Sequence, residues 1–147
     1  MNTLERAKYR GKRVDGGEWV YGSLIQLNNQ CYIEESKNGD LHDIDYGMGL
    51  TQVHPKTVGQ LTGLTDKNGV DIYEGDICSF IDCWDTSTES GYDFQEYSNQ
   101  GEIHFCNEFF GWDITKREQD REDVFIPSEM AVIGNIHDNP ELLEVVK

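Results

Sequence analysis

The stretch that decides the fold is TVGQLTGLTDKNGVDIYEGDI, which spans Thr57–Ile77 of this 147-residue chain. Val58–Gly63 is typical of an extended strand, and Val70 and Ile72 alternate with polar neighbours as in a half-buried strand. Residues that favour or tolerate tight turns fill the gaps, namely Asn68, Gly69, Gly75 and Asp76. The stretch therefore predicts three short strands joined by two tight turns.

Strand-like segments continue on both sides of this stretch. Before it they are Glu18–Gly22, Leu24–Leu27 and Cys31–Ile33, the last two joined by an Asn28-Asn29 hairpin turn. After it they are Ile77–Ile81, Gly101–Phe105, Phe109–Ile114, Val124–Ile126 and Met130–Ile136. Five short strands joined by tight turns are typical of an SH3-like barrel, and an OB-like barrel has a similar pattern. We therefore expect a mainly β protein with a small barrel in its C-terminal half.

The chain is expected to have two regions that pack as one compact unit. Residues 1–56 form a basic arm followed by an antiparallel β-hairpin region. Residues 57–147 form the barrel-like region, with an insertion at 83–100. A short C-terminal helix is predicted after Asn139, which can cap it, and Pro140, which suits the first helical position.

The net charge of the chain is −16 at neutral pH and is unevenly distributed. Residues 1–13 contain five basic residues and one acidic residue, so the other 134 residues carry a net charge of −20. A strongly acidic surface repels nucleic-acid phosphates and anionic lipids. Direct binding to nucleic acid or to a membrane is therefore disfavoured, and any such contact would fall to the basic segment.

Aromatic residues lie beside the basic residues near the N-terminus. Trp19, Tyr21 and Tyr9 could form a stacking platform of the kind that single-strand-binding proteins use. We favour a second interpretation, in which Trp19 and Tyr21 share a strand face and fill the core while the basic arm lies across an acidic neighbour. The basic residues of this candidate surface are Arg6, Arg10, Lys12 and Arg13.

The segment Cys83–Gln100 is polar and rich in turn formers, which predicts a long surface insertion. Its acidic residues recur at spacings of three and four, which would line one face of a helix, but Thr86, Ser87 and Thr88 are poor helix formers. We expect a loop with a role in recognition. Its candidate interaction residues are Trp84, Asp85, Glu89, Tyr92, Asp93 and Glu96.

The four cysteines show no Cys-x-x-Cys spacing, and no apolar run suggests a signal peptide or a membrane span. These features predict a cytoplasmic protein with reduced thiols. Zinc could be held by Cys78, Cys83, His104 and Cys106, but the spacing is loose and Cys78 fits a core strand better. We expect neither a metal nor a cofactor.

No catalytic signature is present, since the chain lacks a Gly-rich phosphate loop, a nucleophile elbow and an HExxH helix. Glu74 and Asp76 flank Gly75 and could imitate the carboxylate pair of a hydrolase. A simpler explanation is that Asp76 makes a side-chain hydrogen bond that fixes the turn. We assign no catalytic residue and keep a hydrolase that uses Glu74 or Asp76 as an alternative.

Three segments together resemble the YopX family of phage and prophage proteins. They are YRGKRVDGGEWVYGSLI (Tyr9–Ile25), TVGQLTGLTDKNGVDIYEGDI (Thr57–Ile77) and IGNIHDNPELLE (Ile133–Glu144). The resemblance implies a mostly β protein of a bacterial host cell that assembles as a homo-oligomer and has no assigned reaction. Cys78 and the Cys83–Gln100 segment depart from the family pattern.

The residues and the resemblance lead to three functional hypotheses. The favoured one is a non-enzymatic phage or prophage accessory protein that forms oligomers and binds another, unidentified protein. The second is an acidic mimic of nucleic acid that occupies a host DNA-binding protein, which requires carboxylates spaced regularly over one face. The third is the hydrolase described above.

Overall fold

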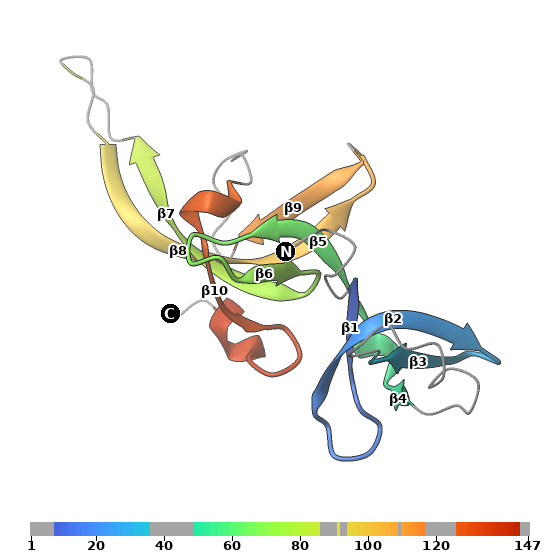
Figure 1. Cartoon of the computed structure of the whole chain (residues 1–147). Helices are drawn as coiled ribbons and strands as arrows, with labels where there is room; N and C mark the ends of the chain where they lie inside the picture. The colour runs from blue at the N-terminus through green and yellow to red at the C-terminus, as the bar shows by residue number, and fades with distance from the viewer. Residues whose placement is uncertain are drawn as a thin grey trace. The chain divides into compact units, whose positions relative to one another are not determined.

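The computed structural model describes residues 8–35, 49–85, 91, 94–108, 110–116 and 126–144. The chain divides into two compact units, Met1–Gly63 and Leu64–Lys147 (Figure 1). The sequence placed a regional boundary at residue 56, whereas the division lies after Gly63, inside strand β5 (Gly59–Thr65). We refer to the two parts as unit 1 and unit 2.

The structure confirms a mainly β protein. Its other strands are β1 (Tyr9–Lys12), β2 (Trp19–Leu27), β3 (Gln30–Glu34), β4 (Leu50–Val53), β6 (Asp71–Tyr73), β7 (Asp76–Asp85), β8 (Phe94–Cys106), β9 (Gly111–Lys116) and β10 (Ala131–Asn135). They form two antiparallel sheets, ordered β4-β3-β2-β1-β5-β6 and β10-β7-β8-β9. The described residues include no α-helix, and therefore no helix long and apolar enough to cross a membrane.

The expected SH3-like or OB-like barrel does not form among the described residues. In the four-stranded sheet β10 and β9 are the two edge strands, and they do not pair with each other. Closing a barrel requires strand number, tilt and register to match around a ring. Here β8 is 13 residues long but pairs with β9 only through Gly101–Cys106, so the strands are too unequal to close.

Unit 1 is built around the β2–β3 hairpin. Asn28 and Asn29 connect the two strands with φ values of 51° and 62°, the left-handed conformation of a two-residue hairpin turn. Val20, Cys31, Ile33 and Val53 form the buried cluster, with Tyr9, Leu24 and Val58 packed against it. Gly22 fits where no side chain could, because a Cβ there would lie 1.8 Å from the backbone oxygen of Glu34.

The basic segment is part of this sheet beyond residue 8, whereas the sequence predicted a basic arm that lies across an acidic neighbour. Tyr9–Lys12 forms β1, which pairs with β2 on one side and with β5 on the other. The expectation that Trp19 and Tyr21 fill the core is wrong. Val20 points to the core, so its neighbours lie on the opposite face, where Tyr21 is 45% exposed.

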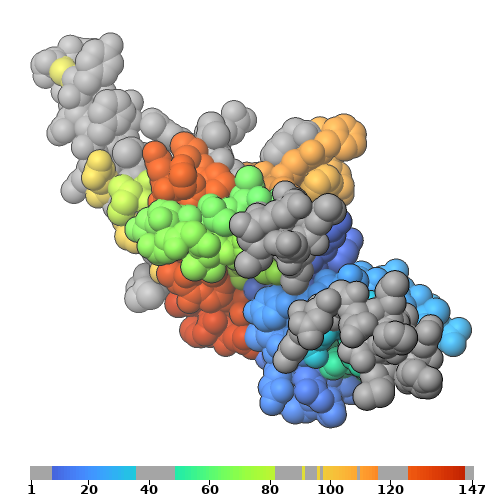
Figure 2. All heavy atoms as spheres, in the orientation of Figure 1, coloured from blue at the N-terminus to red at the C-terminus, as the bar shows by residue number. Residues whose placement is uncertain are grey.

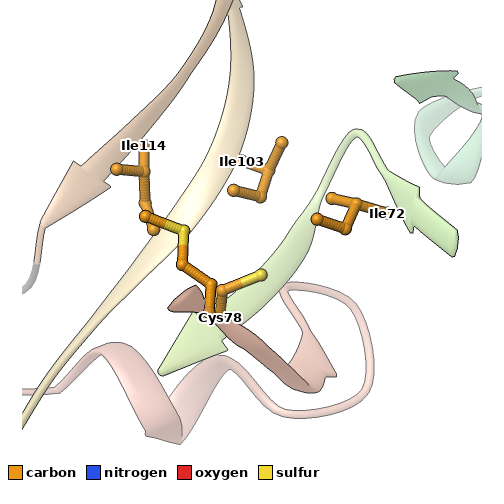
Figure 3. Packing of buried hydrophobic residues seen from close by; sticks show 5 residues of the cluster. Ile72, Cys78, Ile103 and Ile114 are labelled. Carbon is orange, nitrogen blue, oxygen red and sulfur yellow. The ribbon is translucent and has the colours of Figure 1, made fainter. Parts of the chain in front are cut away.

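Unit 2 contains the four-stranded sheet. Its buried cluster consists of Ile72, Cys78, Ile103, Ile114 and Met130, of which Figure 3 labels four. Cys78 pairs with Gly101 and Ile103 pairs with Ile114, so these side chains share one face of the sheet. Cys78 thus packs as a small hydrophobe, as its sequence context indicates.

Most of the segment Cys83–Gln100 is strand, which corrects the expectation of a surface loop. Residues 83–85 extend β7 and residues 94–100 extend β8, with pairs that run from Asp82–Tyr97 to Asp85–Phe94. The two strands therefore continue as a two-stranded ribbon beyond the part of β8 that pairs with β9 (Figure 1).

The predicted C-terminal helix is present as a short 3-10 helix, Pro140–Leu143, not as an α-helix. Pro140 occupies its first turn, but the side chain of Asn139 does not cap it. Instead, Asn139 Oδ1 accepts a hydrogen bond from the backbone N–H of Asn135 at 3.4 Å. The polar side chain is thus used by the preceding turn.

Candidate interaction surface

The segments that carry the family resemblance hold side chains that fix the backbone. Asp66, at the turn after β5, is buried, and its Oδ1 accepts hydrogen bonds from the N–H groups of Asn68 (2.8 Å) and Val70 (2.9 Å). Its Oδ2 accepts one from Val132 N–H in β10 at 2.9 Å. Burial alone would raise the pKa of Asp66, but the three N–H donors outweigh it and leave the pKa below its ordinary value.

The turn between β6 and β7 is fixed in the same way. Asp76 is 2% exposed, and its Oδ2 accepts a hydrogen bond from Tyr73 N–H at 2.8 Å. Gly75 has a φ of 87°, and its N–H donates to Ile103 O at 2.9 Å. These contacts give Asp76 and Gly75 a structural task. A buried carboxylate already holding a backbone N–H is poorly placed to act on a substrate.

The third segment folds into a turn organised by asparagine. Asn135 Oδ1 accepts hydrogen bonds from His137 N–H (3.0 Å) and Asp138 N–H (2.9 Å), while its Nδ2 donates to Asp138 Oδ2 at 3.1 Å. Ile136 N–H donates to Gly75 O at 2.9 Å, which ties this turn to the β6–β7 turn. The most recognisable parts of the sequence therefore account for architecture, and a recognition site is better sought outside them.

The basic residues of the candidate surface are only partly available. Arg10 is 5% exposed and its guanidinium lies 4.6 Å from the centre of the Trp19 ring, with Lys12 Nζ at 5.7 Å from the same ring. Such cation–π contacts stabilise the strand pair on which they lie. Arg10 belongs to the fold rather than to the exposed surface.

Tyr9 does not join Trp19 and Tyr21 in a stacking platform, and the other basic residues of the candidate surface do not supply one. Tyr9 packs against the core of unit 1 and lies on the other sheet face from Trp19. Arg13 is paired with Asp15, at 3.2 Å from Nε to Oδ1, and with Glu18 at 3.6 Å. Arg6 lies outside the described residues.

The candidate residues of the ribbon are also divided. Trp84 and Asp85 lie in β7, paired with Gln95 and Phe94, and Glu96 is exposed in β8. Glu89, Tyr92 and Asp93 lie outside the described residues.

The cysteines and histidine considered for zinc do not converge. Cys78 lies on the core face of the four-stranded sheet, whereas His104 and Cys106 lie on its other face. Burial, reinforced by the charges of Asp76 and Asp66, raises the pKa of Cys78 to about 12, as expected for a thiol packed in a core. No group of three or more metal-ligating side chains occurs among the described residues.

An aromatic surface lies at the end of the β8–β9 hairpin. Phe105 and Trp112 are directly opposite each other, with ring centres 5.4 Å apart and planes at 83°, an edge-to-face pair. Both lie on the same sheet face as Ile103 and Ile114. Trp112 packs against the core, but Phe105 is 42% exposed. The apolar face of the sheet thus continues beyond the core into solvent.

Phe110 is the most exposed large hydrophobic residue among the described residues, at 85%. It lies in the turn just before β9 with a φ of 54°, a conformation that is rare for a bulky side chain and costs about 1–3 kcal/mol. Figure 2 shows the orange atoms of this hairpin at the surface. We define the hairpin-end surface as Phe105, Phe110 and Trp112.

The sequence predicted these aromatics to be strand residues, with Phe105 in Gly101–Phe105 and Phe110 and Trp112 in Phe109–Ile114. In the structure the strand begins two residues later, at Gly111, so Phe110 lies in the turn and outside β9. Asp66 and Asn135 were likewise missed as backbone-fixing residues. The signal that could have found them is an Asp or Asn at the start of a turn. Its side-chain oxygen can accept a hydrogen bond from the backbone N–H two residues further on.

The family model described as YopX protein matches residues 8–144, which is nearly the whole chain. The chain belongs to the YopX family.

A solved structure shares the fold of this YopX family protein. The crystal structure of protein EF1440 from Enterococcus faecalis has a TM-score of 0.51 and 22% sequence identity, over 93% of this chain and 97% of that one. At this identity the similarity concerns the fold alone. No curated protein shows significant sequence similarity to the chain.

Proposed function

We propose that this YopX family protein is a non-enzymatic accessory protein of a phage or prophage that works by binding another protein through the hairpin-end surface. The observation that carries the proposal is Phe110, which is 85% exposed and held at a φ of 54°. A strained, exposed aromatic side chain lowers the stability of the isolated protein, because its strain is not offset by burial of apolar surface. Strain of this kind is typical of recognition sites.

The energetics of protein interfaces support the same element. Burying a phenylalanine side chain fully contributes about 1.5–3 kcal/mol, and a few aromatic anchors carry most of the binding energy of an interface. Phe105 and Trp112 stand beside each other one strand pair from the turn, on a face that the core already holds rigid. A rigid aromatic pair loses little entropy when it is covered.

The carboxylates favour a binding role over hydrolysis. Asp76, one member of the Glu74/Asp76 pair, is buried and hydrogen-bonded to the turn it stabilises. Asp66 is held by three backbone donors. Neither is presented to a substrate in the way that a general acid or base must be.

Site-specific photo-crosslinking tests the proposal. A photoreactive phenylalanine analogue replaces Phe110 in one variant and Leu27 in another, and each is irradiated in bacterial cells that carry the phage. Leu27 is the matched control, because it is 57% exposed and also lies at the end of a hairpin. We expect one discrete adduct from position 110 and none from position 27. Adducts from both positions, or from neither in a folded chain, contradict the proposal.

Nucleic-acid mimicry is a second candidate, favoured by the charge of unit 2. Residues 68–115 contain eleven acidic residues and no lysine or arginine. A mimic would bind through its carboxylates and not through aromatic side chains. Under that alternative, binding to a host DNA-binding protein would survive the change Phe110→Gly and would be lost when Asp82, Asp85 and Glu96 are replaced by the corresponding amides.

A further inference from the structure

We infer that the hairpin-end surface docks into an apolar pocket rimmed by lysine or arginine side chains on the partner protein. This inference rests on the proposed function and names the chemistry of the partner. It combines the shape of the aromatic group with the charge of the chain around it.

The apolar half of the inference follows from how the three aromatics are placed. Phe105 and Trp112 form an edge-to-face pair that continues the core face of the sheet. Phe110 stands in the turn, where 85% of it is exposed. An exposed aromatic side chain in the turn that ends a hairpin can enter a concave apolar pocket, and such anchors carry most of the energy of an interface.

The charge half follows from the groups beside the aromatics. Glu108 is exposed in the turn beside Phe110, whereas Asp113 pairs with His104 on the other face of the sheet. The first basic residue on these strands is Lys116, which pairs with Gly101 at the opposite end of β9. At about 3.4 Å per residue, Lys116 lies about 17 Å from the Cys106–Gly111 pair that closes the hairpin. A complementary partner must therefore supply the positive charge around the pocket.

The same charges argue against a lipid surface as the occupant. Exposed aromatic side chains insert into membrane interfaces when basic residues accompany them. Here the carboxylate of Glu108 accompanies them, and it would meet the negative surface of an anionic membrane. A protein pocket is the occupant that satisfies both the aromatics and the acids.

Selection from a displayed library of random 12-residue peptides tests the inference. Peptides are selected on the wild-type chain and counter-selected on Phe110→Gly, which keeps every charge. This step removes peptides that bind only through attraction to the acidic surface of the chain. We expect the remaining peptides to combine apolar residues with lysine or arginine, and to bind Phe110→Gly at least about thirtyfold more weakly.

Charge variants then measure the second half of the inference on one selected peptide. Glu108→Gln should weaken binding by about two- to fivefold, since rim ion pairs contribute modestly. The matched control is Glu141→Gln, an exposed carboxylate in the 3-10 helix Pro140–Leu143, which should leave binding unchanged. Raising the salt concentration should weaken wild-type binding.

Each outcome decides between the claims. Selected peptides that need Phe110 but lack basic residues overturn the charge claim and leave the proposed function standing. A selection in which no peptide distinguishes the wild type from Phe110→Gly overturns both. Phe110-dependent binding to phosphatidylcholine vesicles, in place of peptides, assigns the surface to lipid and overturns the inference.

Discussion

Asp66 at the turn after β5 accepts a hydrogen bond at 2.9 Å from the backbone N–H of Val132 in β10, 66 residues further along the chain. The same carboxylate accepts two further backbone N–H bonds within its own turn. One buried side chain thus ties the central turn of the sequence to an edge strand of the four-stranded sheet. We therefore expect Asp66 to contribute substantially to the stability of unit 2.

The change Asp66→Asn should destabilise the protein by about 1–3 kcal/mol, because an amide group cannot accept on both sides. If the amide oxygen keeps the hydrogen bonds from the N–H groups of Asn68 and Val70, the amide NH2 faces the N–H of Val132. Two donors then face each other, and the hydrogen bond to Val132 is lost. Urea unfolding measures the difference, with the exposed Asp15→Asn as the control for loss of a charge. Equal stability of the two variants would show that the hydrogen bonds of Asp66 do not stabilise the protein.

The pKa of Asp66 also predicts how stability depends on pH. The folded protein holds this pKa below its ordinary value, so the unfolded chain takes up a proton more readily as the pH falls. The stabilisation is therefore complete well above the unfolded value of about 3.9 and is lost as the pH falls through the folded pKa. Unfolding of the wild type should become easier below about pH 5. In Asp66→Asn that part of the decline should be missing, and an identical acid profile for both proteins would contradict the account.

Cys78 should resist thiol reagents in the folded protein. It is fully buried, and its pKa of about 12 leaves almost no thiolate at pH 8. Iodoacetamide labelling followed by peptide mass spectrometry should find Cys106, which is half-buried, modified before Cys78. In denaturant the two should react alike. Native labelling of Cys78 at the rate of Cys106 would place its thiol in solvent.

The N-terminal residues provide a test that separates folding from self-association. A chain lacking residues 1–13 loses β1, which pairs with both β2 and β5, and should unfold at a lower temperature. A chain lacking only residues 1–7 keeps β1 and should melt as the wild type does. If the charge of Arg6 assists assembly of a homo-oligomer, this shorter truncation should associate less at low salt by light scattering. The same species at every salt concentration would exclude that role.

Local features of the fold could be predicted from the sequence, because they depend on a few neighbouring residues. The Asn28-Asn29 hairpin between β2 and β3 is found as expected. Closure of a barrel could not be predicted, because it depends on the relative lengths of strands that are far apart in the chain. The segment 83–100 was predicted to be a loop because it is rich in turn formers. Residues 83–85 and 94–100 are nevertheless the ends of β7 and β8.

Which face of a strand is buried was also beyond local patterns. In β2, Trp19 and Tyr21 alternate with Val20 and Gly22, so both faces contain apolar residues. The close approach of Gly22 to the Glu34 backbone and of Gly11 to Val53 decides the outcome, since only the face with the glycines can pack tightly. Phe110 was misplaced for a related reason. A two-residue turn and a four-residue loop fit the same local sequence, and the pairing of Cys106 with Gly111 selects the longer loop.

The central claim is that Phe110 serves recognition and not folding, and thermal and urea unfolding of Phe110→Gly tests it most directly. Glycine adopts a φ of 54° without strain, and the side chain that is removed is 85% exposed. We predict that the free energy of unfolding stays the same or rises by about 1 kcal/mol. A loss of more than about 1 kcal/mol would show that Phe110 packs for stability, and would contradict the account.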